Sequence, residues 1–286
     1  MGWLLLSISK ISNVVESMLT REYARRHGNG GLFFNAIICL FACTFYALTD
    51  RNGFNFLPEL WIYGIISAIL YAIGFYSAFI SFKYGSFVLS QILVSFSAIF
   101  SIIYGLAVLH EPSNVFTYIA ITLTFGSLII MNISNRTESA DSKFSFKWLI
   151  AIIFAVLSNG FIGIISRLQQ LRFNNACNNE FLIISLGGSF FALLIGSFII
   201  ERKDMLFIVK KGSVYGLLAG SVNGLKSTCN LLTYNYIPIS LVSSIGIGIS
   251  NVVSFIVSIF VYKERLSVQQ FVGAIMGVCA IIMLNI

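Results

Sequence analysis

Two residues of opposite charge stand out because the stretches around them are apolar. Lys226 lies within "GSVNGLKSTCNLL", which begins at Gly220, and Glu16 lies in a polar stripe near the N-terminus. Inside a membrane helix a lysine costs about 2.5–3.5 kcal/mol on insertion scales. A buried glutamate is the best partner for a buried lysine. The residue types therefore predict an ion pair, in which Lys226 could hold an anionic group of a substrate and Glu16 could hold a cation or carry a proton.

Uncharged polar residues accompany both charges at helical spacing, about 100° per residue. Those that share a face with Lys226 are Asn223, Ser227 and Asn230. Asn13 lies on the stripe of Glu16. Lipid does not tolerate such faces, so they predict either a wet cavity or a polar seam that only joins helices. Lys10 stands nearer the end of its predicted helix, and we expect it to snorkel to the membrane surface.

The composition indicates which kind of element must position these residues. Of the 286 residues, 57% are hydrophobic and only 10% are charged, and the mean hydropathy is +0.89. Soluble chains carry roughly 25% charged residues, so we expect an all-α polytopic membrane protein. The net charge of +7 then reflects basic loops that set topology, and it indicates no nucleic-acid partner.

Few residues could support metal, redox or hydrolytic chemistry. The two histidines and five cysteines show no metal-ligand spacing,, and the chain lacks a GxxxxGK[ST] phosphate-binding motif,. Ser227 directly follows Lys226, but adjacent helical positions point about 100° apart, which disfavours a Ser–Lys dyad. We therefore expect no cofactor, no metal site and no enzymatic activity.

Stretches long enough to cross a bilayer, about 20 mainly apolar residues each, occur ten times. The predicted helices are 3–20, 31–49, 59–81, 86–109, 115–132, 147–166, 180–200, 212–233, 238–261 and 268–285. Five helices precede the central connection and five follow it. If the two groups are repeats, an odd number of helices in each forces them into opposite orientations, which is the inverted-repeat plan of many transporters.

Matching residues at similar separations indicate such a repeat. A shift of 153 residues places Ser97 on Ser250 and Glu111 on Glu264. Small residues four positions apart let helices approach closely. Gly216, Gly220 and Gly224 have this spacing, and the corresponding helix of the first half has small residues at the matching positions. Further candidate substrate-binding residues are repeat mates of those above or lie on comparable faces: Asn159, Tyr71, Gln91 and Asn251.

The ends of the two halves carry a family resemblance. They read "YGLAVLHEPSNVFTYIAITLTFGSLIIMN" and "VSIFVYKERLSVQQFVGAIMGVCAIIMLN", and the turns "FKYGSFVLSQ" and "YNYIPISLVSS" open the helices before them. These motifs resemble the EamA-like half of the drug/metabolite transporter superfamily. The resemblance implies a first five-helix repeat at 1–132, a connecting loop at 133–146 and a second repeat at 147–286, around a central cavity. Glu111 and Glu264, at the ends of helices, are expected to have structural or gating roles at its rim.

The resemblance implies a secondary transporter of a small polar or amphiphilic metabolite, amino-acid-like or drug-like, that acts as an exporter or exchanger by alternating access. The expected partners are the lipid bilayer, the small-molecule substrate and a proton or counter-substrate, and a monomer is compatible with the sequence. We expect a multi-pass protein of the cell membrane. A membrane scaffold or partner subunit with a dry interior, and less so an intramembrane enzyme, are the alternatives that remain open.

The orientation of the chain receives two opposite predictions. Basic residues are concentrated in the loops after odd-numbered predicted helices, so the positive-inside rule places both termini outside the cytoplasm. The family resemblance implies both termini inside. We regard the charge bias as the stronger of the two indications.

Overall fold

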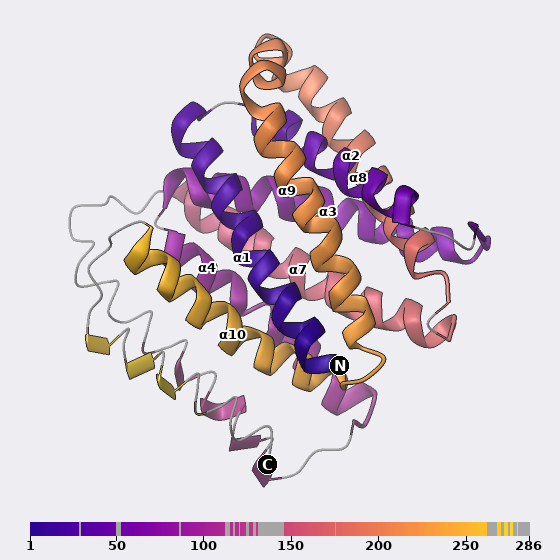
Figure 1. Cartoon of the computed structure of the whole chain (residues 1–286), viewed down its shortest axis with the longest axis vertical. Coiled ribbons are helices and arrows are strands. Elements are labelled where there is room, and N and C mark those ends of the chain that lie inside the picture. Colours follow the sequence, from indigo (N-terminus) through magenta and orange to yellow (C-terminus); the bar gives the residue numbers. More distant parts are fainter. Residues whose placement is uncertain are drawn as a thin grey trace.

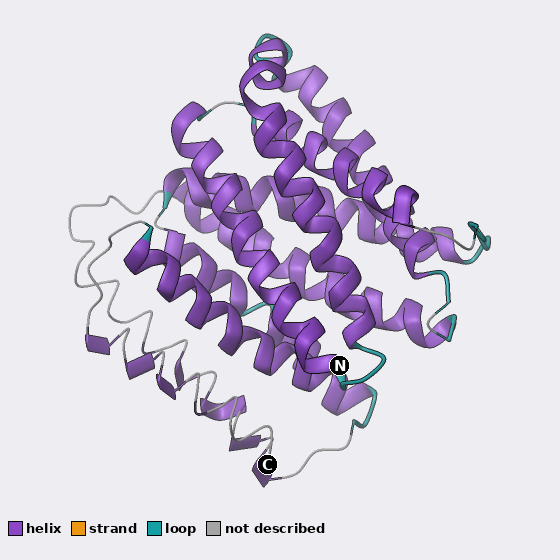
Figure 2. Cartoon of the chain, in the orientation of Figure 1, coloured by secondary structure: helices purple, strands orange, loops and turns teal. Residues whose placement is uncertain are grey.

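The computed structural model describes most of the chain, and all regular structure within the described residues is helical (Figure 2). The described residues are 1–28, 30–49, 53–85, 87–111, 115–116, 118–119, 121–123, 126–127, 130, 146–174, 176–261, 268–269, 272–273, 275–276 and 279. The predicted loop 133–146 falls almost entirely outside them, and only parts of the predicted helices 115–132 and 268–285 are included. The ten-helix count therefore stays a prediction.

The helices follow the order expected from the apolar stretches and pack into one bundle (Figure 1). The helical elements are α1 (Gly2–His27), α2 (Gly31–Thr49), α3 (Leu60–Tyr84), α4 (Phe87–Ser95), α5 (Ala98–Ile103), the π-helical turn η1 (Tyr104–Val108), α7 (Phe146–Arg172), α8 (Asn178–Ile200), α9 (Met205–Thr233) and α10 (Ile239–Phe260).

The first helix is longer than its apolar stretch predicts. It continues to His27 instead of ending at residue 20, and Gly28 follows it with φ of 67°, the left-handed conformation that closes many helices,. Arg25, Arg26 and His27 occupy its last turn, where positive charge interacts favourably with the helix dipole,. At 1.5 Å per residue, a helix of this length spans about 39 Å, which exceeds the roughly 30 Å of a bilayer core.

The predicted helix 86–109 is divided in the structure. The α4 helix ends at Ser95 and α5 begins at Ala98, with a turn between them, and η1 follows directly. The hydroxyl of Ser95 donates a hydrogen bond to the Gln91 carbonyl at 2.9 Å, four residues back, and serine bonds of this kind often bend helices. The turn falls where α4 and α5 border the cavity described below.

The helices pack in a reciprocal pattern. The α1 helix packs along α9, as Figure 1 shows, and α3 packs along α7. The α2 helix contacts α9 and the α3 helix contacts α8, while α2 and α8 also contact each other. The contacts are symmetric under an exchange of α1 with α7, α2 with α8 and α3 with α9. Under this exchange the α1–α9 contact becomes the α3–α7 contact, the α2–α9 contact becomes the α3–α8 contact, and the α2–α8 contact is unchanged.

Small residues form the close contacts, as the spacing predicts. A Cβ atom at Gly220 of α9 would lie 2.6 Å from the Ile38 carbonyl oxygen of α2, so only glycine permits this approach. The Tyr46 hydroxyl donates to the Gly224 carbonyl at 2.9 Å and ties the same two helices together. In α8, Gly188 faces Ala68 of α3. Small residues therefore also lie at the contact between α8 and α3.

Five of the described helices are long and apolar enough to cross a membrane: α2, α3, α7, α8 and α9. Parts of α4–η1 and of α10 are shorter apolar helices. Large apolar side chains are exposed on the outside of the bundle, including Ile62, Ile65 and Ile69 on α3 and Ile199 on α8. A lipid-facing surface has this character, whereas a soluble protein rarely exposes apolar patches of such extent.

Candidate functional site

A cavity of about 260 Å³ lies among α1, α3, α4, α5, α7, α9 and α10, and one residue of α8 borders it. The candidate binding residues named from the sequence come from six of these helices: α1, α3, α4, α7, α9 and α10. The largest share of its polar lining comes from α1, and α4, α5, α7, α9 and α10 add further polar side chains. A cavity of this size is near the lower end of small-molecule pockets. It has space for a molecule of roughly amino-acid size.

The predicted ion pair is present between α1 and α9. One carboxylate oxygen of Glu16, Oε2, accepts a hydrogen bond from the Lys226 ammonium at 2.5 Å. The other oxygen, Oε1, accepts from the side-chain amide of Asn223 at 2.8 Å. The Ser9 hydroxyl donates to the backbone carbonyl of Lys226 at 3.0 Å and holds the two helices in this register.

Burial makes this pair costly to break. The Glu16 side chain is 8% exposed and that of Lys226 is 20% exposed. Removing one member of a buried pair costs about 3–5 kcal/mol, because the remaining charge has lost its partner. Each charge therefore offsets the burial cost of the other while the cavity is empty.

Lys10 does not reach the membrane surface, contrary to the sequence-based expectation. Its ammonium lines the cavity and donates to the Asn230 side-chain oxygen at 3.4 Å. The stem of Lys10 lies against Gly246 of α10, where a Cβ atom would approach the lysine Cε to 2.4 Å. A glycine on a helix distant in sequence creates the space for this side chain, and the pattern of α1 alone does not contain that information.

Most of the predicted binding residues border the same cavity. They are Asn13, Glu16, Tyr71, Gln91, Asn159, Lys226, Ser227 and Asn230. Asn223 is fully buried behind Glu16. Asn251 also lies behind the wall, where it accepts a hydrogen bond at 3.5 Å from the lining residue Ser95. The structure thus brings the predicted residues together, and their role in substrate binding stays a prediction.

Sequence reasoning missed part of the wall contributed by α10. Ser243, Gly246 and Ser250 line the cavity from this helix. Their spacing of three and four residues places them on one face. That spacing was a usable signal, but small residues on an apolar helix equally predict helix packing.

Glu111 has a structural role that accounts for its position at a helix end. Its carboxylate accepts from the backbone N–H groups of Ile239 and Ser240 at 2.9 and 3.0 Å, and from the Ser240 hydroxyl at 2.5 Å. These groups form the first turn of α10, where a negative charge stabilises the helix dipole. Glu264 lies outside the described residues.

Glu201 performs the same role for α2. Its two oxygens accept from the backbone N–H groups of Leu32 and Phe33 at 3.0 Å each. A second hollow of about 820 Å³ borders this region and is lined partly by Lys83, Lys147 and Glu201. Lys83 already donates to the Gly28 carbonyl, and Glu201 is occupied by α2. The cavity of about 260 Å³ contains the buried ion pair and most of the predicted binding residues, so it is the better candidate site.

Comparison with known proteins identifies the family. The family model described as "EamA-like transporter family" matches residues 2–133, and no curated protein matches the sequence. Among 28 matching chains of solved structures, one titled "Crystal structure of protein" has a TM-score of 0.73 and 9% sequence identity, over 99% of this chain and 98% of that chain. At this identity the likeness shows the fold alone. The match assigns residues 2–133 of this integral membrane protein, just under half of the chain, to the EamA-like transporter family and thereby to the drug/metabolite transporter superfamily.

Proposed function

We propose that this protein is a secondary transporter that moves a small polar or amphiphilic metabolite, amino-acid-like or drug-like, across the cell membrane. One observation carries the proposal: a polar cavity of about 260 Å³ with a buried ion pair lies inside a bundle of apolar helices. Lipid would not tolerate these charges, and a scaffold has no need of a polar chamber. We further propose that the transporter is an exporter or exchanger.

Alternating access is the proposed mechanism, with two inverted five-helix repeats as its frame. The reciprocal packing of α1 on α9 and α3 on α7 supports this symmetry. In inverted-repeat transporters the substrate site lies at the repeat interface, and the two halves rock around it. The contact between α1 and α9 joins the two proposed halves beside the cavity, so it would rearrange when access switches.

The ion pair would interact with the substrate. Lys226 would hold a carboxylate and Glu16 a cationic group or a proton. An amino-acid-like substrate would then replace the Glu16–Lys226 pair with two ion pairs, one to each residue. When the substrate leaves, Glu16 and Lys226 neutralise each other again. Such an exchange keeps both charges compensated at each stage, which lowers the cost of carrying charge through a low-dielectric interior.

Transport by the purified protein in proteoliposomes tests the proposal. We expect counterflow of at least one compound from a panel of radiolabelled amino acids and small amphiphiles. The double variant Glu16→Gln/Lys226→Met removes both charges without leaving one unpaired, so it should fold and lose this flux. The matched control Glu59→Gln/Arg172→Met removes an ion pair whose two side chains are each 61% exposed, and it should transport normally. Flux through the Glu16/Lys226 double variant at the wild-type rate would exclude the site.

A further inference from the structure

The cavity of the proposed transporter contains more positive than negative charge. Among the described residues that line it, the charged side chains are two lysines and one glutamate: Lys10, Lys226 and Glu16. The carboxylate of Glu16 is occupied by Lys226 and Asn223. Lys10 donates instead to a neutral amide oxygen, that of Asn230. Two ammonium groups and one carboxylate leave this part of the lining with one positive charge in excess.

The position of Lys10 is fixed by its surroundings. Gly246 accommodates the lysine stem, and a larger residue there would collide with it. Asn230 lies one helical turn from Lys226 on α9, and residues four apart on a helix are neighbours. Both ammonium groups therefore lie beside the same wall. Hydroxyl groups of Ser243 and Ser250 also line the cavity and could donate hydrogen bonds to an anion.

The excess charge matters most when the cavity closes. Water can solvate Lys10 while the cavity is open. Excluding that water leaves an uncompensated charge in a low-dielectric interior, which is strongly unfavourable. A substrate with one negative charge removes the penalty, whereas a neutral or cationic substrate leaves or increases it.

We infer that the substrate carries a net charge of −1 and places a carboxylate against Lys10. This inference rests on the proposed function and narrows its substrate class. A monocarboxylate would bind Lys10 and leave the Glu16–Lys226 pair intact. An amino acid with two carboxylates would use both lysines and place its ammonium at Glu16. The apolar part of either molecule would contact Phe75 and Phe82, which also line the cavity.

Pairs of similar compounds, one with a net charge of −1 and the other with a net charge of zero, test the inference. We would measure the thermal shift of the full-length protein in detergent with glutamate and glutamine, lactate and alanine, and benzoate and benzamide. In at least one pair, the compound of charge −1 should stabilise the protein while its neutral counterpart does not. If in no pair the anion stabilises more than its counterpart, the inference is wrong.

Variants of Lys10 connect that preference to one side chain. Lys10→Gln should lower the apparent affinity for the anion by at least about tenfold, and Lys10→Arg should retain most of it. Asn230→Asp supplies an internal counter-ion for Lys10 and should lower the apparent affinity for the anion to a similar extent. Lys210→Gln removes the same charge from an exposed position on α9 and should bind as wild type does. Because each shift is measured against the variant's own unliganded melting temperature, a change in stability alone does not imitate the result.

Failure of this inference differs from failure of the proposed function. Counterflow of neutral or cationic compounds that is unaffected by Lys10→Gln would overturn the charge preference and leave a transporter. Anion stabilisation that depends on Lys10, without flux of that anion in proteoliposomes, would support the site and overturn transport. Anion-selective flux that Lys10→Gln abolishes supports both.

Discussion

Asn223 shows how a residue outside the cavity can govern a charge inside it. Its side chain is fully buried, and its amide donates to the Glu16 oxygen that Lys226 does not occupy. Together the two α9 residues engage both oxygens of the carboxylate. The orientation of Glu16 toward the cavity therefore depends on a neighbour that a substrate does not need to touch.

We predict that substitutions at Asn223 reduce stability in a defined order. Asn223→Ala leaves a Glu16 oxygen without its donor, at a cost of about 1–3 kcal/mol. Asn223→Asp also places a second negative charge beside Glu16 and should cost more. Thermal unfolding in detergent should give the highest melting temperature for the wild type, a lower one for Asn223→Ala and the lowest for Asn223→Asp. Asn235→Ala, at an exposed position just beyond α9, should match the wild type, and equal stability of all four proteins would contradict the prediction.

The sequence was sufficient to pair Glu16 with Lys226 but not to place Lys10. The pairing followed because Glu16 and Lys226 have opposite charges and each lies in a polar stripe within an apolar stretch, where a buried charge needs a partner,. The location of Lys10 depends on Gly246, which is 236 positions away in the chain (246 − 10). Helical periodicity describes one face of one helix, and it cannot show which face of another helix will be opposite.

At the scale of helices, two carboxylates cap helix starts that belong to the other predicted half. Glu111, from the first half, caps α10, and Glu201, from the second half, caps α2. The sequence predicted a structural or gating role at the cavity rim for Glu111 but not its partner. The missing information was again the neighbouring element, since α10 is not the helix that follows Glu111 in the chain.

We predict that Glu111→Gln destabilises the protein by about 0.5–2 kcal/mol, the usual range for loss of a charged helix cap. Hydrogen exchange should become faster at the first amides of α10, Ile239 and Ser240. The control is Glu59→Gln, since Glu59 forms an exposed pair with Arg172 and such pairs contribute about 0–1 kcal/mol. Unchanged exchange at α10 in the Glu111 variant would contradict the prediction.

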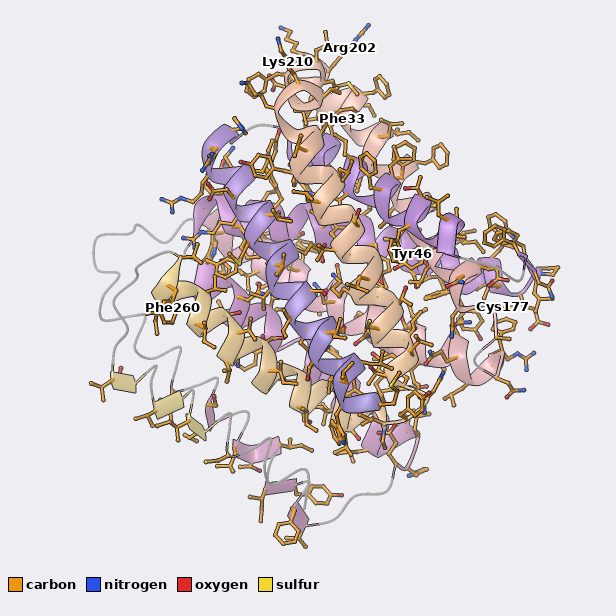
Figure 3. All side chains as sticks on the ribbon, in the orientation of Figure 1. Phe33, Tyr46, Cys177, Arg202, Lys210 and Phe260 are labelled. Atoms are coloured by element: carbon orange, nitrogen blue, oxygen red, sulfur yellow. The ribbon has the colours of Figure 1, made fainter. Side chains whose placement is uncertain are left out.

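At the scale of the whole molecule, the distribution of basic residues bears on orientation. Arg202 and Lys210 lie at the same end of the molecule (Figure 3). The α9 helix begins at that end and finishes near Asn235 at the opposite side of the bundle. The positive-inside rule predicts that the end with Arg202 and Lys210 faces the cytoplasm.

Thiol labelling of intact cells tests this orientation. In a background without the five native cysteines, we expect Asn235→Cys to react with a membrane-impermeant maleimide. Lys210→Cys should react only after the cells are permeabilised. Both positions are exposed in the structure, so accessibility is matched. The reverse pattern would favour the orientation that the family resemblance implies.

The general architecture was more predictable than its details. Hydropathy located α2, α3, α7, α8 and α9 because bilayer thickness imposes a minimum apolar length. It did not predict the turn between α4 and α5, where Ser95 hydrogen-bonds to backbone and to Asn251. Hydropathy is an average over a window of sequence, so it contains no information about a local hydrogen bond or a turn within a helix.

The cap on α2 has a consequence for biosynthesis. Glu201 lies 169 positions after Leu32, and its carboxylate accepts a hydrogen bond from the Leu32 N–H group. At about 5–20 residues per second, the ribosome would complete the cap roughly 8–34 s after it makes the start of α2. During that interval α2 must lie in the membrane while water accepts the hydrogen bonds of its first backbone N–H groups. We therefore expect that a nascent chain arrested before residue 201 inserts α2 less stably than the finished protein does.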